Sequence, residues 1–202
     1  THRGEGYVGV RGRGGAGGVF GYRAPPFMTN PQDDAFPRRC RDLAAVGGTL
    51  DLRIRRNPGF HGPDSATPMI LIGSGSGLAG LRAHLQERAT KPGSRNWLLF
   101  GERHAAHDAL LIDELRAWQH SGHLERIDLT YSRDGNPQRY VQDALRESAS
   151  TLRAWLADGA AIYLCGSLDG MGRDVDACLR QLLGDEQLEQ LSQNGRYRRD
   201  LY

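Results

Sequence analysis

Short apolar segments alternate with amphipathic stretches along residues 68–183. Four segments predict strands, at residues 69–72, 97–100, 127–131 and 161–164, and the continuous apolar run at 69–72 is typical of a strand covered on both faces. Apolar residues at helical spacing predict helices over residues 78–89, 108–120, 140–156 and 171–183. Strands that alternate with helices of this length need right-handed crossovers. The pattern therefore predicts an α/β fold with a doubly wound parallel sheet of the nucleotide-binding kind.

The residues before position 48 differ from the rest in composition and in the spacing of apolar residues. Residues 4–21 are rich in glycine, and residues 24–41 carry scattered Pro, Asp and Arg without a sustained period of 2 or 3.6. Such a segment has too little apolar surface to offset the entropy lost on ordering it. We predict that residues 1–47 are irregular, and we favour a tail over a binding role. Residues 49–54 then alternate as a half-buried strand does.

Composition narrows the classes of function. The 202 residues are 39% hydrophobic and 25% charged, as in ordinary globular proteins. The 26 basic and 24 acidic residues nearly cancel, so we expect no electrostatic binding to nucleic acid or to a membrane surface. No apolar run reaches 18 residues, so we expect neither a membrane span nor an export signal.

Cysteine and histidine spacing adds little further chemistry. The three cysteines are widely spaced and form neither a disulfide framework nor a zinc pattern, so we expect a reducing, cytoplasmic compartment. The pairs His104/His107 and His120/His123 have a spacing compatible with metal binding, but no third ligand accompanies either pair. We therefore expect no metal site.

A glycine-rich loop follows the first strand of the predicted sheet. Glycine lets backbone N–H groups approach a pyrophosphate closely, and the helix that begins near Leu78 presents its positive end there. The spacing of Gly75, Gly77 and Gly80 also fits the G-x-G-x-x-G pattern. An ordinary glycine turn is the alternative to a phosphate site. The loop residues are Gly73, Ser74, Gly75, Ser76 and Gly77.

Polar side chains follow the second and third strands, at the edge where a doubly wound sheet binds ligands. Glu102 suits a ribose 2′-hydroxyl, whereas its neighbour Arg103 suits a phosphate, so this pair leaves the choice of cofactor open. Donors and positive charge after the third strand suit a 2′-phosphate, although a solvated polar loop would have the same composition. These residues are Ser132, Arg133, Arg139, Tyr140 and Gln142.

Cys165 and Gly166 follow the fourth strand. A cysteine at the end of a buried strand is more often a small core residue than a reactive one. Here the glycine that follows leads us to expect the Cys165 sulfur to face the ligand cleft.

Together these motifs resemble the C-terminal NADPH-binding lobe of the ferredoxin–NADP reductase superfamily. The most similar branch is the diflavin type, which includes the sulfite reductase flavoproteins and the NADPH–cytochrome reductases. Six segments carry the resemblance in the right order, and they are residues 72–79, 96–103, 129–133, 140–142, 162–166 and 196–202.

The resemblance implies cofactors, domains and roles. It implies NADP(H) and FAD as cofactors, with residues 48–67 as the end of an FAD-binding barrel and residues 68–202 as the NADP(H)-binding domain. The glycine loop would hold the pyrophosphate, and Ser132, Arg133 and Tyr140 would read the 2′-phosphate. Cys165 would sit beside the nicotinamide and Asp200 would complete its polar surround. Tyr202 would stack on the flavin and move aside for hydride transfer.

Two departures from the family pattern keep alternatives open. The basic residue expected two positions before Tyr140 is replaced by Gln138, with Arg139 displaced by one. The Arg-x-Tyr-Ser motif of the flavin-binding barrel is absent before Gly48, so we expect a fragment or a product of a shifted reading frame. A reductase lobe would pass electrons to an acceptor protein or to a flavodoxin-like FMN domain. The alternative is a truncated, non-catalytic NADP-binding module.

Overall fold

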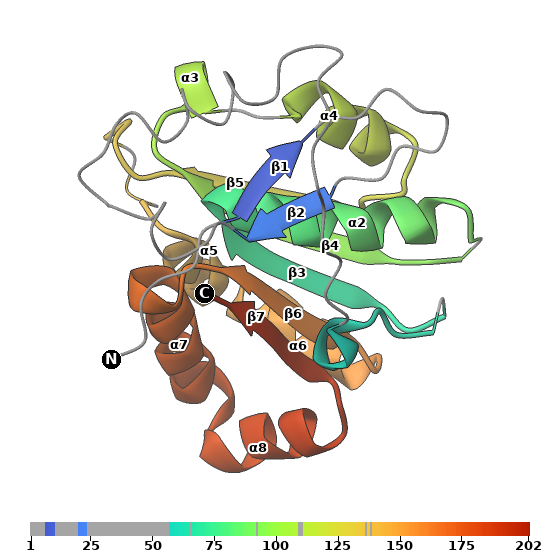
Figure 1. The fold of residues 1–202 in the computed structure, drawn as a ribbon. Helices are drawn as coiled ribbons and strands as arrows, with labels where there is room; N and C mark the ends of the chain where they lie inside the picture. Colours follow the sequence, from blue (N-terminus) through green and yellow to red (C-terminus); the bar gives the residue numbers. More distant parts are fainter. Residues whose placement is uncertain are drawn as a thin grey trace.

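A five-stranded parallel sheet forms the centre of the molecule (Figure 1). The computed structural model describes residues 7–10, 20–23, 57–64, 66–91, 93–108, 111–135, 137 and 139–202. The strand order in the sheet is β5-β4-β3-β6-β7, and each strand is parallel to its neighbours. The strands are β3 (Met69–Ser74), β4 (Asn96–Glu102), β5 (Arg126–Tyr131), β6 (Ala161–Gly166) and β7 (Tyr197–Leu201).

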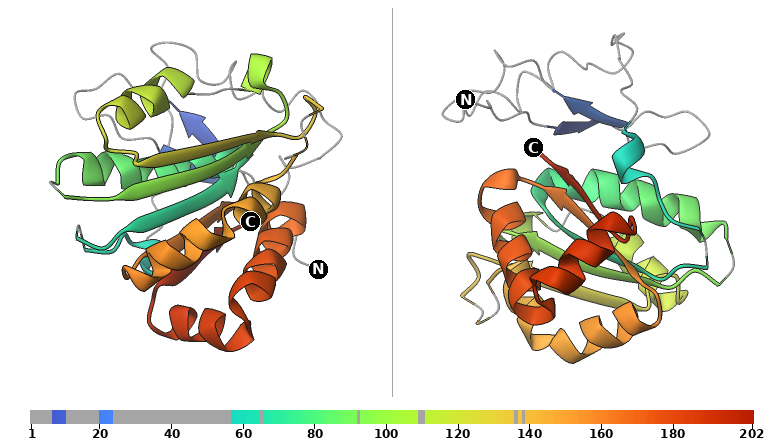
Figure 2. Two further views of the ribbon diagram at one scale, coloured as in Figure 1. Left: turned by 180° about the vertical axis from the view of Figure 1, so that it is seen from behind. Right: turned by 90° about the horizontal axis from the view of Figure 1, so that it is seen from below.

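Helices cover both faces of this sheet, so the fold has three layers (Figure 2). One face packs against α2 (Leu78–Ala89) and α4 (Ile112–His120), with the short α3 (Ala105–Asp108) beside the end of β4. The opposite face packs against α5 (Val141–Glu147), α6 (Ala149–Ala157), α7 (Arg173–Leu183) and α8 (Asp185–Gln193). Short helical turns precede β3, α2 and α7, and they are η2 (Pro58–Phe60), η3 (Gly75–Gly77) and η4 (Leu168–Gly172).

The strands contribute to two separate cores because successive side chains point to opposite faces of a sheet. On β3, Met69 and Leu71 join the core under α2, whereas Ile70 and Ile72 join the core under α5, α6 and α7. All four side chains are fully buried. Burying such a side chain stabilises the fold by roughly 1.5–3 kcal/mol, so these alternating runs specify both layers of helices.

The predicted architecture is confirmed, with differences at several element boundaries. All four predicted strands form, and the helix predicted over residues 78–89 has those bounds. The helix predicted over residues 140–156 is divided at Ser148, whose hydroxyl accepts a hydrogen bond from Arg126 at 2.6 Å. The helix predicted over residues 108–120 is also divided, since α4 begins after Leu111, which has a positive φ of 60°.

Four further elements, β7, α8, β1 and β2, were not predicted. Strand β7 and helix α8 follow α7, and the polar sequence of β7 is tolerated because it forms one edge of the sheet. Within residues 1–47 the structure describes β1 (Tyr7–Val10) and β2 (Phe20–Arg23), which pair as antiparallel strands. The prediction of an irregular segment was therefore wrong for these eight residues. The predicted strand over residues 49–54 lies outside the described part of the chain.

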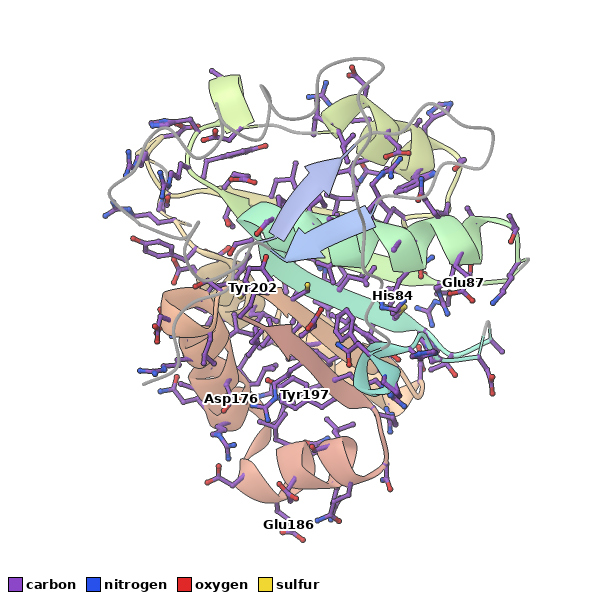
Figure 3. The ribbon with its side chains drawn as sticks, in the orientation of Figure 1. His84, Glu87, Asp176, Glu186, Tyr197 and Tyr202 are labelled. Carbon is purple, nitrogen blue, oxygen red and sulfur yellow. The ribbon has the colours of Figure 1, made fainter. Side chains whose placement is uncertain are left out.

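The segment before β3 is attached to the sheet domain by several independent contacts. Phe60 is buried in the core under α2, and the Tyr163 hydroxyl donates a hydrogen bond to the His61 carbonyl at 2.7 Å. The buried Arg88 guanidinium donates to the Thr67 carbonyl at 2.8 Å. His84 on α2 contacts both aromatic rings, with centroid distances of 5.1 Å to Phe60 and 5.0 Å to Tyr163 (Figure 3).

Because burial lowers the pKa of His84 to about 4, we expect this contact to weaken on acidification. Between pH 6.5 and 4 the unfolded chain binds a proton at His84 and the folded chain does not. The free energy of unfolding therefore decreases as the pH is lowered through this range. This single group accounts for a loss of up to about 3 kcal/mol across that window.

Urea denaturation between pH 4 and 7.5 measures this effect. His84→Gln should have a flatter pH profile than the original chain, whereas His120→Gln, on the exposed end of α4, should keep the original slope. Equal slopes in all three proteins would contradict the assignment to His84.

Candidate functional site

A cleft of about 540 Å³ opens at the carboxyl ends of the central strands. The chain runs outward from β3 to β4 and β5, then returns to the other side of β3 as β6, so the cleft lies at the switch in strand order. Ligands of open α/β sheets bind at this position. The residues that line the cleft are Ser74, Gly75, Gly101, Glu102, Arg103, Thr130, Ser132, Arg139, Tyr140, Val141, Gln142, Ser167, Asp169, Gly170, Met171 and Asp174.

The glycine loop contributes one wall of the cleft and opens α2. Gly75 has a positive φ of 54°, which favours glycine, and a side chain there would meet no atom within 4 Å. No side chain caps the start of η3 or of α2, and the Leu78 N–H donates to the Gly75 and Ser76 carbonyls. Of the five predicted loop residues, Ser74 and Gly75 line the cleft, Gly73 and Gly77 are buried, and Ser76 is exposed outside it.

The glycines behind the wall let α2 approach the end of β6. A Cβ atom on Gly73 would lie 2.6 Å from the Cys165 carbonyl oxygen, and one on Gly77 would overlap the same carbonyl group. A Cβ atom on Gly80 would lie 3.0 Å from the Cys165 sulfur. These positions therefore need glycine for close packing, in addition to any part that the loop has in binding.

The residues predicted to read a 2′-phosphate form the wall opposite the glycine loop. Ser132, Arg139, Tyr140 and Gln142 all line the cleft, whereas Arg133 is exposed and does not. The Arg139 guanidinium donates to the Ser132 carbonyl from Nε at 3.3 Å and from Nη2 at 3.2 Å. The displacement of the basic residue to position 139 therefore still brings a guanidinium beside Ser132.

Cys165 lies in a different environment from the one expected. Its side chain is 3% exposed and belongs to the core under α2, so the expectation that its sulfur faces the cleft was wrong. The close approach of α2 explains the burial, since Gly80 leaves room for the sulfur beneath the helix. Burial, with a smaller contribution from Asp200, raises the pKa of the Cys165 thiol to about 12. Cys165 is therefore a neutral thiol at physiological pH.

Strand β7 brings Asp200 and Tyr202 to the same end of the sheet as Cys165. Asp200 pairs with Cys165 in the register of β6 and β7, and its Oδ1 accepts a hydrogen bond from Asn57 at 3.2 Å. Tyr202 packs against the core under α2, and its hydroxyl makes a short hydrogen bond with the Ser76 hydroxyl (Figure 3). The carboxyl-terminal residue is thus joined directly to the glycine loop.

Sequence reasoning missed several residues that the tertiary structure brings into the cleft. Asp174 on α7 accepts a hydrogen bond from the Gln142 amide at 3.3 Å, which fixes that amide at the cleft wall. Thr130 is 2% exposed, and its hydroxyl is the one buried side-chain polar atom without a hydrogen-bond partner among the described residues. A buried hydroxyl without a partner in a cleft wall is a group that a ligand or an ordered water can satisfy.

The wall also carries an acidic group. Burial in the first place, and the nearby charge of Asp108 in the second, raise the pKa of Glu102. A negative charge on Glu102 is therefore less stable than on an exposed glutamate, which lowers its repulsion of a bound anion.

A parallel sheet with a cleft at its switch point defines the class of dinucleotide-binding α/β domains. Within that class, the chain belongs to the oxidoreductase NAD-binding domain family, which it matches over residues 71–177. The resemblance to the NADPH-dependent flavoprotein reductases is confirmed by the curated relatives.

These relatives are sulfite reductase [NADPH] flavoprotein alpha-components. The protein from Neisseria meningitidis serogroup C, strain FAM18, is 37% identical over 203 residues, which cover 95% of this chain and 31% of the relative. The protein from Salmonella arizonae is 37% identical over 205 residues, which cover 96% of this chain and 31% of the relative. The chain therefore spans about 31% of the length of these relatives.

The extent of the matches bears on residues 1–47. An alignment that covers 95% of the chain includes most of this segment, whereas other alignments cover 80% of the chain. In the part of the chain that the structure describes, no helix is long and apolar enough to cross a membrane.

Tyr202 lies against the core that buries Cys165, so its removal should expose the sulfur. In the intact chain we expect slow alkylation of Cys165 by iodoacetamide at pH 8, because the thiolate is the reactive form. Tyr202→Ala should accelerate this reaction several-fold.

Mass spectrometry of the Cys165 peptide measures the rate. The Cys178 peptide is an internal control, since Cys178 is buried in the core on the opposite face of the sheet. An unchanged rate at Cys165, or equal acceleration at both cysteines, would show that Tyr202 does not cover the sulfur.

Proposed function

We propose that this chain binds NADPH and positions its nicotinamide for hydride transfer to FAD, from which electrons pass to a haem or sulfite-reductase-type acceptor. The observation that carries the proposal is the cleft itself. A glycine loop at a helix N-terminus faces a wall that contains Ser132, Arg139 and Tyr140. These walls suit the pyrophosphate and the 2′-phosphate of NADPH, respectively.

The cleft fits such a dinucleotide in size and in chemistry. Its volume of about 540 Å³ lies within the range of small-molecule and cofactor sites. A side chain at Gly75 would extend into the space where a phosphate would approach the loop backbone. The Thr130 hydroxyl, which lacks a partner among the described side chains, supports occupation of the cleft by a polar ligand.

The carboxyl-terminal residues have roles at the nicotinamide end of the proposed site. Bound NADPH supplies the hydride, and the protein supplies orientation and electrostatics. The Cys165 thiol is neutral and buried, so we assign it to shaping the nicotinamide pocket and not to nucleophilic attack. The Asp200 carboxylate is placed to stabilise positive charge that grows on the ring during transfer. Tyr202 covers this region and moves aside for access.

The chain spans about 31% of the length of its relatives. The parts played by FAD and by the electron acceptor are therefore proposed from the names of those longer relatives. The relatives are flavoproteins by name, which supports FAD as the hydride acceptor. We propose residues 48–67 as the end of the flavin domain and residues 68–202 as the NADP(H)-binding domain. An electron-acceptor protein or a flavodoxin-like FMN domain is the proposed partner, and a cytoplasmic location stays a prediction.

Arg139 tests the assignment of the 2′-phosphate wall. We expect Arg139→Ala to weaken NADPH binding by roughly 1–3 kcal/mol, the value of hydrogen bonds to a charged group, and to leave NADH binding nearly unchanged. Lys91→Ala is the matched control, because it removes a positive charge at the opposite end of α2. Isothermal titration measures both dissociation constants. Equal losses for the two nucleotides in Arg139→Ala would contradict the assignment.

A second candidate function is an NADP-binding module without catalysis, since the cleft by itself accounts for nucleotide binding. If the chain is a reductase by itself, the purified protein should be yellow and should oxidise NADPH with ferricyanide as acceptor. A colourless protein that binds 2′,5′-ADP and does not reduce ferricyanide with added FAD would establish the binding module.

A further inference from the structure

The Thr130 side chain lies at the floor of the cleft and carries an unsatisfied hydroxyl. Thr130 is 2% exposed, and among the described residues its Oγ1 is the one buried side-chain polar atom without a hydrogen-bond partner. The residue nevertheless lines the cleft, so a ligand that reaches the floor can contact it. An unpaired buried hydroxyl destabilises a fold, and most such groups have a partner. The position of Thr130 therefore points to a partner that the ligand supplies.

Thr130 belongs to a row of three residues that crosses the sheet at the cleft. In the register of β3, β4 and β5, Ser74 pairs with Gly101 and Gly101 pairs with Thr130, and all three residues line the cleft. A Cβ atom on Gly101 would lie 3.1 Å from the Thr130 Oγ1 and 3.8 Å from the Ser74 Cβ. The three positions therefore face the same side of the sheet. Because Gly101 has no side chain, a gap separates the two hydroxyl-bearing residues, and the Thr130 hydroxyl borders it.

The groups that border this gap are uncharged. Besides Ser74 and Thr130, the gap is bordered by Val141, whose Cγ1 would lie 3.1 Å from a Cβ atom on Gly101. Charged side chains that line the cleft are three carboxylates and two guanidinium groups, on Glu102, Asp169, Asp174, Arg103 and Arg139. The charge of the cleft as a whole thus does not draw an anion to its floor. Burial of a phosphate against uncharged groups is costly, whereas a neutral hydroxyl is satisfied there by one hydrogen bond.

The position of the gap indicates which part of the nucleotide would lie over it. In the proposed site, the pyrophosphate lies at the loop after β3 and the 2′-phosphate lies at the wall after β5. The adenosine ribose carries both groups, so it would span the end of β4 and lie over Gly101. Its 2′ and 5′ oxygens are esterified, which leaves the 3′-hydroxyl as the free hydroxyl of that ring. This hydroxyl can both donate and accept a hydrogen bond, as the Thr130 hydroxyl can.

We propose that the Thr130 hydroxyl forms a hydrogen bond with the 3′-hydroxyl of the adenosine ribose and selects nucleotides that carry it. This inference rests on the proposed binding of NADP(H), and it concerns a residue to which the resemblance assigns no role. In the free chain the unsatisfied hydroxyl lowers the stability of the fold, and the bound ribose removes that cost. Replacement of the hydroxyl by a methyl group therefore affects the free chain and the complex in opposite directions.

The test combines Thr130→Val, which exchanges the hydroxyl for a methyl group of similar size, with two probes that differ in the 3′-hydroxyl alone. The probes are 2′,5′-ADP and its 3′-deoxy analogue, and isothermal titration on the whole 202-residue chain gives both dissociation constants. Thermal unfolding without ligand compares the stabilities. Thr130→Ser keeps the hydroxyl. Thr90→Val is the matched control, because the Thr90 hydroxyl is exposed at the far end of α2 and donates to the Glu87 carbonyl.

We expect Thr130→Val to weaken 2′,5′-ADP binding about threefold to tenfold, as loss of a neutral hydrogen bond requires, and to change binding of the 3′-deoxy analogue by less than about twofold. Without ligand, the unfolding midpoint of Thr130→Val should rise by about 2–4 °C, because an unsatisfied polar group leaves the interior. Thr130→Ser should keep the difference between the two probes, and Thr90→Val should bind both as the original chain does.

Equal losses for the two probes in Thr130→Val, or unchanged binding of 2′,5′-ADP, would overturn the contact with the 3′-hydroxyl. A lower unfolding midpoint in Thr130→Val would show that the hydroxyl is already satisfied in the free chain, for example by an ordered water, and would also overturn the inference. These outcomes leave 2′,5′-ADP binding by the original chain, and with it the proposed function, intact. If the original chain does not bind 2′,5′-ADP, the proposed function fails first, and the role of Thr130 fails with it.

Discussion

The close approach of α2 to the end of β6 is the constraint on which the remaining structure depends. A side chain at Gly73 would lie 2.6 Å from the Cys165 carbonyl oxygen, so the first turn of α2 reaches this position only because the loop lacks side chains there. The same approach directs the helix N-terminus toward the cleft and encloses the Cys165 sulfur beneath Gly80. One packing contact thus determines both the position of the N-terminus of α2 and the burial of the thiol.

The order of the strands turns separate sequence motifs into one site. The segments after β3, β4, β5 and β6 are far apart in the chain, yet they meet because β3 lies between β4 and β6. The loops after β4 and β5 are joined by continued ladder hydrogen bonds and by the Asp134 carboxylate. Such cross-links hold cationic and hydroxyl groups at fixed positions before a ligand arrives, which reduces the entropy lost on binding.

Strand β7 connects the two ends of the proposed site. It pairs with β6 at the edge of the sheet, and its last residues bring Asp200 beside Cys165. The Tyr202 hydroxyl is bonded to Ser76 in the glycine loop, and its ring packs against the core that contains Cys165. The end of β7 therefore joins the glycine loop to the core beside the end of β6.

The sequence by itself determined the class of fold and most of the loops that form the site. Apolar runs such as residues 69–72 specify strands buried on both faces, and the glycine loop predicts a turn between strand and helix, because these signals are local. Only the tertiary structure decided which guanidinium groups line one cleft, since Arg103 and Arg139 line it and Arg133 does not. It also decided that β7 forms and that Cys165 is buried, because both follow from contacts with β6 and α2 that local patterns do not encode.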